Sequence, residues 1–161
     1  MGKKAKSGGD KPGHKTVARN RQAFRNYFIE DRYEAGMVLT GSEVKSLRDG
    51  RVNLGDSYGE IRGGELFLLK CHISTYPNAS YNNHEPMRER KLLLHKQQLK
   101  RLGVKLRERG FTLVPLAIYF KEGWAKVELG LGKGKKLHDK RDAVRDRDVK
   151  RDVAKEASRR E

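Results

Sequence analysis

Apolar and polar side chains alternate along residues 27–39, and no other feature limits the possible folds of this chain as strongly. Tyr27, Ile29 and Tyr33 hold odd positions, whereas the even positions from 30 to 34 are all charged. A period of two places successive side chains on opposite faces of a β-strand. The sequence therefore predicts a strand with one buried face, and a bend in it near Gly36.

Three later segments predict more strands of this kind. Residues 58–73 have the pattern of a hairpin that reverses at the consecutive glycines Gly63-Gly64. Residues 111–120 and 124–131 predict two further strands joined by a tight turn. Pro115 has no N–H donor, so it indicates a sheet edge or a β-bulge in the first of these two strands.

Two short helices are predicted between the strands. Ser42 is the expected N-cap of the first helix, which ends at Gly50. The second begins at about Lys96 and ends at Gly110, with leucines on one stripe: Leu99, Leu102 and Leu106. Short antiparallel strands with two small helices favour a closed or partly open barrel over a parallel sheet. We expect this barrel to span residues 20–132.

The net charge of +16 is concentrated at the two ends of the chain. Residues 1–25 contain eight basic residues and one acid, and residues 133–161 contain twelve and seven. Neither end has enough apolar residues to fold alone, so we expect a disordered basic arm over residues 1–19 and a separate C-terminal tail over residues 133–161. Field attraction and counterion release make a polyanion the expected partner.

The single cysteine, Cys71, excludes an intrachain disulfide and a zinc site built from several cysteines. No metal site and no cofactor are predicted. The sequence shows neither an apolar run long enough to cross a membrane nor an N-terminal secretory signal. We therefore expect a cytoplasmic protein.

The run "GKGKKLHDKR" at residues 132–141 invites comparison with catalytic motifs. A phosphate-binding P-loop requires Ser or Thr where Lys136 stands. His138 and Asp139 are neighbours in a flexible basic segment, so they have neither a fixed geometry nor a third partner. The sequence predicts no enzymatic activity and no catalytic residue.

Nucleic-acid binding fits the polar residues better. Cations beside apolar anchors can hold phosphates in register, and two stretches with this pattern supply the candidates Lys45, Arg48, Arg88, Arg90 and Lys91. Glu34 in the first strand can accept hydrogen bonds from base edges or fix an arginine. The aromatic residues could stack on bases or simply pack in the fold: Tyr27, Tyr119, Phe120 and Trp124.

The tail has opposite charges at helical spacing, such as Asp146–Lys150 and Glu156–Arg160. Its apolar stripe is too thin to dock firmly, so the helix would be marginal in isolation. We expect a tail that is disordered when free and helical when bound to a polyanion. A solvated tail that only aids solubility fits the composition equally well.

Several stretches, in this order, resemble the SsrA-binding protein family, also called small protein B, the partner of transfer-messenger RNA. The most specific are "NRQAFRNYFIEDRYEAG", "EVKSLR", "HEPMRERKLLLHK" and "GKGKKLHDKR", within a resemblance that runs from Asn20 to about Arg151. The resemblance implies a mainly β protein, an OB-fold-like antiparallel barrel of about six strands with two or three short helices. It also implies that the protein binds the tRNA-like domain of transfer-messenger RNA and enters the vacant A site of a stalled bacterial ribosome with elongation factor Tu. The outcome would be trans-translation, in which the incomplete protein is tagged and the ribosome is released.

The resemblance directs attention to two groups of residues. Beside the cations already named, the candidates for binding the RNA domain are Asn20, Arg21, Glu34, Leu93 and His95. The tail, helical on the ribosome, would contact the decoding centre and messenger channel through Gly134, Lys135, Lys136, His138, Asp139, Lys140, Arg141, Arg145 and Lys150. The imidazole of His138 could stack there on an RNA base. Relatives often have Trp where this chain has Val149.

A different function also suits basic arms on a small barrel. The chain could be a structural ribosomal protein or a general basic RNA-binding protein, and the residues alone leave this alternative open. In either case we expect a monomer.

Overall fold

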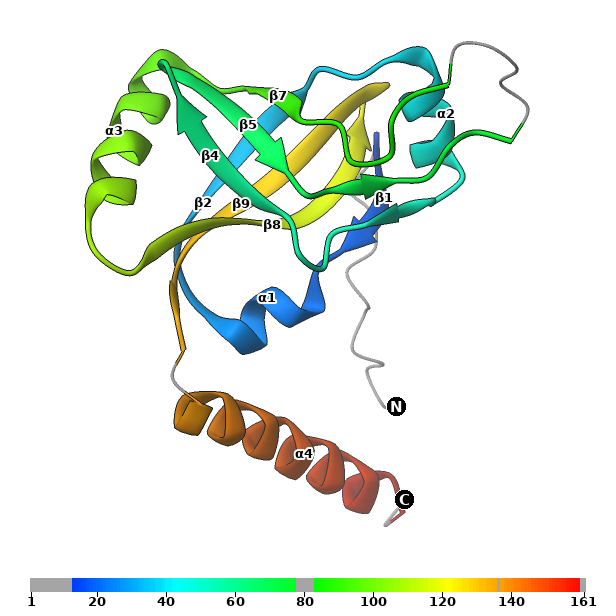
Figure 1. The fold of residues 1–161 in the computed structure, drawn as a ribbon. Coiled ribbons are helices and arrows are strands. Elements are labelled where there is room, and N and C mark those ends of the chain that lie inside the picture. Colours follow the sequence, from blue (N-terminus) through cyan, green and yellow to red (C-terminus); the bar gives the residue numbers. More distant parts are fainter. Residues whose placement is uncertain (1–12, 78–82, 136, 160–161) are drawn as a thin grey trace.

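The computed structural model describes residues 13–77, 83–135 and 137–159 of the chain. The strands are β1 (His14–Arg19), β2 (Tyr27–Met37), β3 (Val52–Asn53), β4 (Tyr58–Arg62), β5 (Glu65–Leu69), β6 (His72–Ile73), β7 (Arg90–Leu93), β8 (Phe111–Lys121) and β9 (Trp124–Gly134). The helices are α1 (Arg21–Asn26), α2 (Gly41–Arg48), α3 (Lys96–Arg107) and α4 (Leu137–Arg159). Figure 1 shows the strands wrapped into one body, from which α4 projects.

Six of the strands close into an antiparallel barrel. Their order is β8-β4-β5-β7-β2-β9, and β9 pairs with β8 to complete the ring. The strand β1 pairs with the second half of β8, beyond the residue of β8 that pairs with β4. The strands β3 and β6 form a separate short ribbon. This architecture confirms the predicted mainly β, OB-fold-like barrel of about six strands.

The long strands bend at β-bulges. In β8 the register shifts between Pro115 and Ala117, which confirms the bulge that the proline predicted. In β2 the shift lies between Ile29 and Asp31, not near Gly36 as expected. Gly36 instead pairs regularly with strands on both sides, so the ladder has no extra residue to accommodate at this point.

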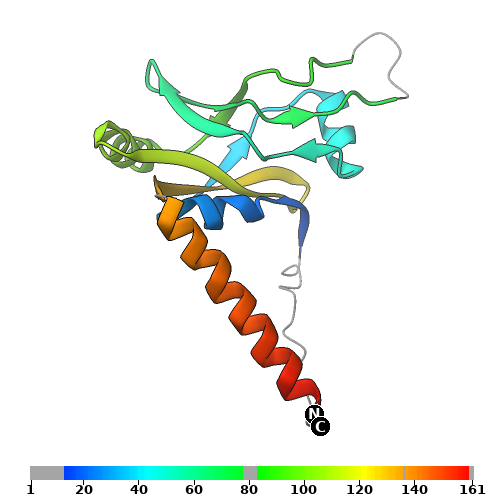
Figure 2. The same cartoon turned by 60° about the horizontal axis from the view of Figure 1, so that its bottom comes forward.

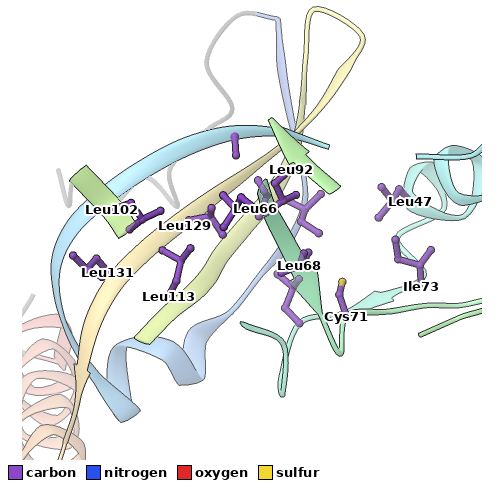
Figure 3. Packing of buried hydrophobic residues seen from close by; sticks show 14 of the residues in the cluster. Leu47, Leu66, Leu68, Cys71, Ile73, Leu92, Leu102, Leu113, Leu129 and Leu131 are labelled. Atoms are coloured by element: carbon purple, nitrogen blue, oxygen red, sulfur yellow. The ribbon is translucent and has the colours of Figure 1, made fainter. Parts of the chain in front are cut away.

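Apolar side chains that point inward from the strands fill the barrel interior, as Figure 3 shows. Leu113 of β8 and Leu129 and Leu131 of β9 are fully buried. Gly59 of β4 packs directly against Leu113, because a Cβ at this position would lie 2.5 Å from the Leu113 Cδ2 atom. The missing side chain therefore lets β4 and β8 approach each other.

Both predicted short helices are present, but the first begins differently. Thr40, not Ser42, is the N-cap of α2, and it forms a capping box with Glu43. The Ser42 hydroxyl is buried and lies 2.9 Å from Nδ1 of His84. A capping box satisfies two backbone N–H donors at once, and this favours Thr40 over Ser42 as the N-cap of α2.

Residues 14–19 were expected to belong to a disordered arm, and this part of the prediction is wrong because they form β1. The strand adds to the free edge of β8, and its Val17 and Ala18 side chains pack against the barrel core. Backbone pairing and this burial stabilise a segment whose composition alone gave no sign of order. The rest of the predicted arm, residues 1–12, lies outside the described residues.

Outside the barrel, α1 covers a second apolar cluster made of Ala23, Val114 and Leu116. The tail helix α4 begins beside α1 and extends away from the barrel, as the two views in Figures 1 and 2 show. The tail residues, whose charges have helical spacing, thus form a helix. Disorder of the tail in the free chain stays a prediction. Among the described helices, none is both long and apolar enough to span a membrane.

Candidate RNA interface

A cleft of about 720 Å³ opens on the outer surface of the barrel, between β1, α1, β2 and β8. Its walls combine cations, aromatic rings and carboxylates: His14, Arg19, Arg21, Phe24, Arg32, Glu34, Tyr119 and Glu128. Three predicted RNA-binding residues, Asn20, Arg21 and Glu34, contribute to this one cleft. The fold therefore brings residues of the motif at positions 20–36 together with β8, which lies much later in the sequence.

Glu34 is held at the surface by two side chains of β8. The strand β2 buries its neighbour Ala35 in the core, so the Glu34 carboxylate points outward. The Tyr119 hydroxyl donates a hydrogen bond to one carboxylate oxygen. The Lys121 Nζ atom lies 3.4 Å from the other oxygen. The position of the carboxylate is thus set from both sides.

These contacts also fix the protonation state of the cleft. The hydrogen bond from Tyr119 is the main cause that lowers the pKa of Glu34, and Lys121 and Lys126 add to it against a smaller effect of burial. Burial and the adjacent Glu34 carboxylate raise the pKa of Tyr119 above its ordinary value. At neutral pH the cleft therefore presents an ionised acceptor held by a neutral phenol donor.

Aromatic rings and guanidinium groups surround this acceptor. The His14 and Tyr119 rings stack with centroids 5.3 Å apart and planes 12° from parallel. The Arg32 guanidinium lies over the Phe24 ring at 5.4 Å and pairs with Glu128 at 3.2 Å. Such a surface can offer cations to phosphates, a carboxylate to base-edge donors, and ring faces for stacking.

Leu93 and His95 lie on an exposed surface next to Glu34. Leu93 of β7 pairs with Gly36 of β2, two residues beyond Glu34 on the same face of that strand. Its side chain is 55% exposed, which is unusual for a leucine in a barrel strand. His95 is the N-cap of α3, and its exposed side chain makes no capping hydrogen bond. The structure therefore brings Leu93, with His95 two residues after it, to the β2 segment that contains Glu34, although these residues are far from Glu34 in sequence.

The Asn20 side chain is engaged within the fold, and its predicted role in RNA binding stays a prediction. The residue is only 7% exposed, and its amide donates to the Pro115 carbonyl at 3.0 Å. Its backbone N–H also donates to the Leu116 carbonyl at 2.7 Å. Asn20 thus anchors the start of α1 on β8, while the next residue, Arg21, is exposed at the cleft.

Arg90 is likewise engaged within the fold, where it has 0% exposure, and its predicted role in RNA binding stays a prediction. Its guanidinium donates to Glu43 of α2 and to the Cys71 carbonyl. Burial raises the pKa of Glu43, but hydrogen bonds from Arg88, the Thr40 backbone and Arg90 outweigh it and lower the pKa to about 2. This buried ion pair fastens α2 to β7.

The remaining predicted cations are at the surface but engage local partners. Lys45 and Arg48 lie on the exposed side of α2, where their charged groups sit 5.6 Å from the ring centroids of Tyr76 and Phe120, respectively. Arg88 donates to Glu43 at 2.6 Å, and Lys91 pairs with Glu65 at 3.0 Å. Their side chains remain partly open to solvent, so RNA binding by them stays a prediction.

The predicted tail contacts begin at a junction that α1 holds in place. Gly134 ends β9 opposite Tyr27. The Lys135 backbone donates to the Asn26 carbonyl at 2.8 Å, and its Nζ atom donates to the Phe24 carbonyl at 3.1 Å. Lys135 thus satisfies carbonyls at the end of α1.

The other tail candidates follow this junction. Lys136 lies outside the described residues, as do the side chains of His138, Asp139 and Lys140, although the latter three belong to α4. Arg141, Arg145 and Lys150 are exposed on this helix.

Sequence reasoning did not identify His14, Arg19 and Arg32 as part of the cleft. Arg32 shares the outward face of β2 with Glu34, and this period-two relationship could have found it. His14 and Arg19 lie in β1, and only its long-range pairing with β8 brings them to the cleft. A local pattern in the sequence contains no signal for such a pairing.

The described residues do not form a metal or thiol centre. No group of three or more His, Cys, Asp and Glu side chains among them could hold a metal ion. Burial raises the pKa of the Cys71 thiol to about 11, so this group is protonated and inert at neutral pH. The polar surface described above therefore carries the functional interpretation.

The chain is similar to SsrA-binding proteins from several bacteria. It is 55% identical to that of Anaeromyxobacter sp. (strain Fw109-5), over 92% of this chain and 90% of the relative. It is 54% identical to that of Geobacter sulfurreducens, over 88% and 93% of the two chains. For Symbiobacterium thermophilum the identity is 58%, over 86% and 89%.

The fold and the family profile agree with these relatives. A solved chain described as "tmRNA-SmpB: a journey to the center of the bacterial ribosome" superimposes with a TM-score of 0.66 at 50% identity, covering 80% of this chain and 94% of that chain. The profile of the SmpB protein family, an RNA-binding family and not a family of enzymes, matches residues 17–159. The chain belongs to the SmpB protein family.

Proposed function

We propose that this protein binds the tRNA-like domain of transfer-messenger RNA and delivers that RNA to stalled ribosomes for trans-translation. It acts as an adaptor without catalysis, rescuing the ribosome and allowing the incomplete protein to be tagged. Family membership, SsrA-binding relatives and the similarity to a chain from a tmRNA-SmpB complex support this function. The observation in the structure that carries it is the ionised Glu34 carboxylate, held in a cleft beside exposed arginine and aromatic side chains.

In this proposal the RNA domain contacts one continuous surface of the barrel, from the cleft to Leu93 and His95. Glu34 accepts hydrogen bonds from base edges, and Arg21 neutralises phosphates at the rim of the cleft. The exposed side chain of Leu93 supplies an apolar contact, and His95 offers a ring face for stacking. Asn20 and Arg90 act indirectly, because they hold α1 and α2 on the barrel.

The tail acts apart from this surface. The helix α4 enters the empty messenger channel of the small subunit and contacts the decoding centre, with His138 stacking on a base and the tail cations facing phosphates. Elongation factor Tu participates through its complex with the RNA. The protein works as a monomer in the cytoplasm, where ribosomes translate.

Binding to the isolated tRNA-like domain tests the RNA part of the proposal. The full-length protein should bind tightly, and its affinity should fall steeply with salt because phosphate contacts release counterions. Glu34→Gln should weaken binding by about tenfold, the value of one lost charged hydrogen bond. Glu60→Gln removes an exposed carboxylate from β4 and is the matched control. A salt-independent binding curve, or equal affinities of the two variants, would contradict the proposal.

Truncation after Lys135 tests the division of labour. This cut leaves β9 and the contacts of Lys135 with α1 intact. The truncated protein should keep its affinity for the RNA domain within about twofold and lose tagging on stalled ribosomes. A truncated protein that no longer binds the RNA domain would show that barrel and tail do not act separately.

A further inference from the structure

The helix α3 and the turn after it hold the net positive charge of residues 26–132, the part of the chain from β2 to β9. Residues 96–109 contain six basic residues and one acid. Residues 26–132, which include them, contain seventeen basic residues and thirteen acids. The remainder of this region therefore has eleven basic residues and twelve acids. Within residues 26–132, the net positive charge therefore lies in one segment.

The cations of this segment have few partners. Cations elsewhere on the barrel have carboxylate partners. Arg32 of β2 pairs with Glu128 at 3.2 Å, and Lys91 of β7 pairs with Glu65 at 3.0 Å. In α3, the only ion pair within the described residues joins Lys105 to Glu108 at 3.8 Å. The exposed cations without a hydrogen bond or ion pair among the described residues are Lys96, Lys100, Arg101, Arg107 and Arg109.

An apolar side chain lies among these cations. Val104 is 62% exposed, whereas Leu102 on the opposite side of the helix is fully buried in the barrel core. Beside Val104, a groove of about 530 Å³ separates α3 from β2. We call the surface made of Lys100, Arg101, Val104 and Arg107 the α3 face. It combines unpaired charges with an apolar contact, as a surface that binds a sugar–phosphate backbone requires.

The helix α3 lies close to the end of β9, where the tail begins. The Phe111 ring lies between two ammonium groups, at 5.9 Å from Lys105 Nζ of α3 and at 4.8 Å from Lys133 Nζ of β9. Both views in Figures 1 and 2 place α3 and the start of α4 at the same end of the barrel. A partner that meets the start of the tail therefore lies within reach of α3.

We propose that the α3 face docks on the phosphate backbone of the small-subunit ribosomal RNA, as a contact separate from the Glu34 cleft. This inference rests on the proposed function, because a tail in the messenger channel brings its first residues, and α3 beside them, next to that RNA. The exposed cations give up no internal ion pair when they meet phosphates. Their gain is the release of counterions.

The variant Lys100→Gln/Arg101→Gln/Arg107→Gln removes the charge while keeping good helix-forming residues. The control Lys15→Gln/Arg51→Gln/Lys70→Gln removes three exposed cations at other positions. Each full-length protein is bound to transfer-messenger RNA, and its affinity for small ribosomal subunits is measured across a salt series. The affinity of each protein for the isolated tRNA-like domain and the midpoint of its thermal unfolding are measured in parallel.

The α3 variant should bind subunits at least about tenfold more weakly than the control, and its log–log salt slope should be smaller by about 2 to 3. Its affinity for the tRNA-like domain and its thermal midpoint should match those of the control. Equal binding of both variants to subunits would overturn the inference and identify the α3 face as a solvated surface. A loss of affinity for the tRNA-like domain alone would also overturn the inference, because the α3 face would then bind transfer-messenger RNA. Failure of the unmodified protein to bind that domain would instead refute the proposed function.

Discussion

At the scale of single residues, burial decides which charged groups can serve as contacts. Arg90 and Arg21 are both arginines in family-like motifs, yet Arg90 is fully buried on Glu43 whereas Arg21 is exposed at the cleft. The sequence marks both as basic and says nothing of this difference. It did single out Glu34 as an exposed carboxylate in a strand, because the period of two sets the outward face.

Removing the Tyr119 hydroxyl should weaken RNA binding and shift its pH dependence. In Tyr119→Phe, Glu34 keeps only the contact with Lys121, so affinity for the tRNA-like domain should fall by about fivefold. The hydrogen bond lowers the pKa of Glu34, so its loss raises that pKa, and binding should begin to weaken at a higher pH on acidification. Tyr58→Phe removes a hydroxyl elsewhere on the barrel and should change neither property. An unchanged pH profile in Tyr119→Phe would exclude this role of the phenol.

Glu43→Gln should destabilise the fold by about 3–5 kcal/mol, since it leaves the buried Arg90 guanidinium without its counterion. The folded-state pKa of Glu43 is about 2, below its ordinary value of 4.5. Its stabilising contribution is therefore complete above pH 4.5 and is lost as the pH falls toward 2. Urea titrations across this range measure both effects. The exposed Glu89→Gln change, which breaks a surface pair with Arg62, should leave the stability nearly unchanged; equal costs would contradict the account.

At the scale of elements, local patterns identified most strands and helices, and long-range pairing explains the main exception. The β4–β5 hairpin, α3 and the bulge at Pro115 follow from glycine, leucine and proline positions close to one another in sequence. The choice of Thr40 over Ser42 as N-cap follows from the capping box with Glu43, a local pattern that the prediction overlooked. The strand β1, in contrast, depends on pairing with β8, and this partner cannot be read from the neighbouring sequence. For the same reason the sequence supplied Arg21 and Glu34 of the cleft but not His14 and Arg19 of β1.

A methyl group at Gly59 should disturb the contact between β4 and β8. In Gly59→Ala the new Cβ would meet Leu113 at 2.5 Å, so the free energy of unfolding should fall by about 1–3 kcal/mol. Gly41→Ala, at the start of α2, meets nothing within 4 Å and should be neutral or slightly stabilising. Thermal or urea unfolding distinguishes the two, and a fully stable Gly59→Ala protein would mean that the strands are less closely packed than described.

At the scale of the whole molecule, one barrel supports surfaces with different tasks. The Glu34 cleft opens between β1, α1, β2 and β8, while α4 begins at the end of the barrel occupied by α3. The helix α1 lies between them, with Phe24 lining the cleft and its carbonyl bonded to Lys135. This arrangement suits an adaptor that holds one RNA while its tail engages another.

The adaptor function predicts transient association with ribosomes. Sedimentation in about 0.5 M salt, where electrostatic contacts are screened within a few ångströms, should release the protein from subunits. A structural ribosomal protein, the alternative that the basic composition allowed, would remain bound through the wash.

Tagging in a reconstituted translation system tests the central claim most directly. Ribosomes stalled at the end of a message without a stop codon are supplied with transfer-messenger RNA and elongation factor Tu, with or without this protein. We predict that the encoded tag is added to the incomplete protein only when the full-length chain is present, and that Glu34→Gln reduces the yield at limiting RNA while Glu60→Gln does not. Equal tagging with and without the chain, or no tagging when it is present, would contradict the account.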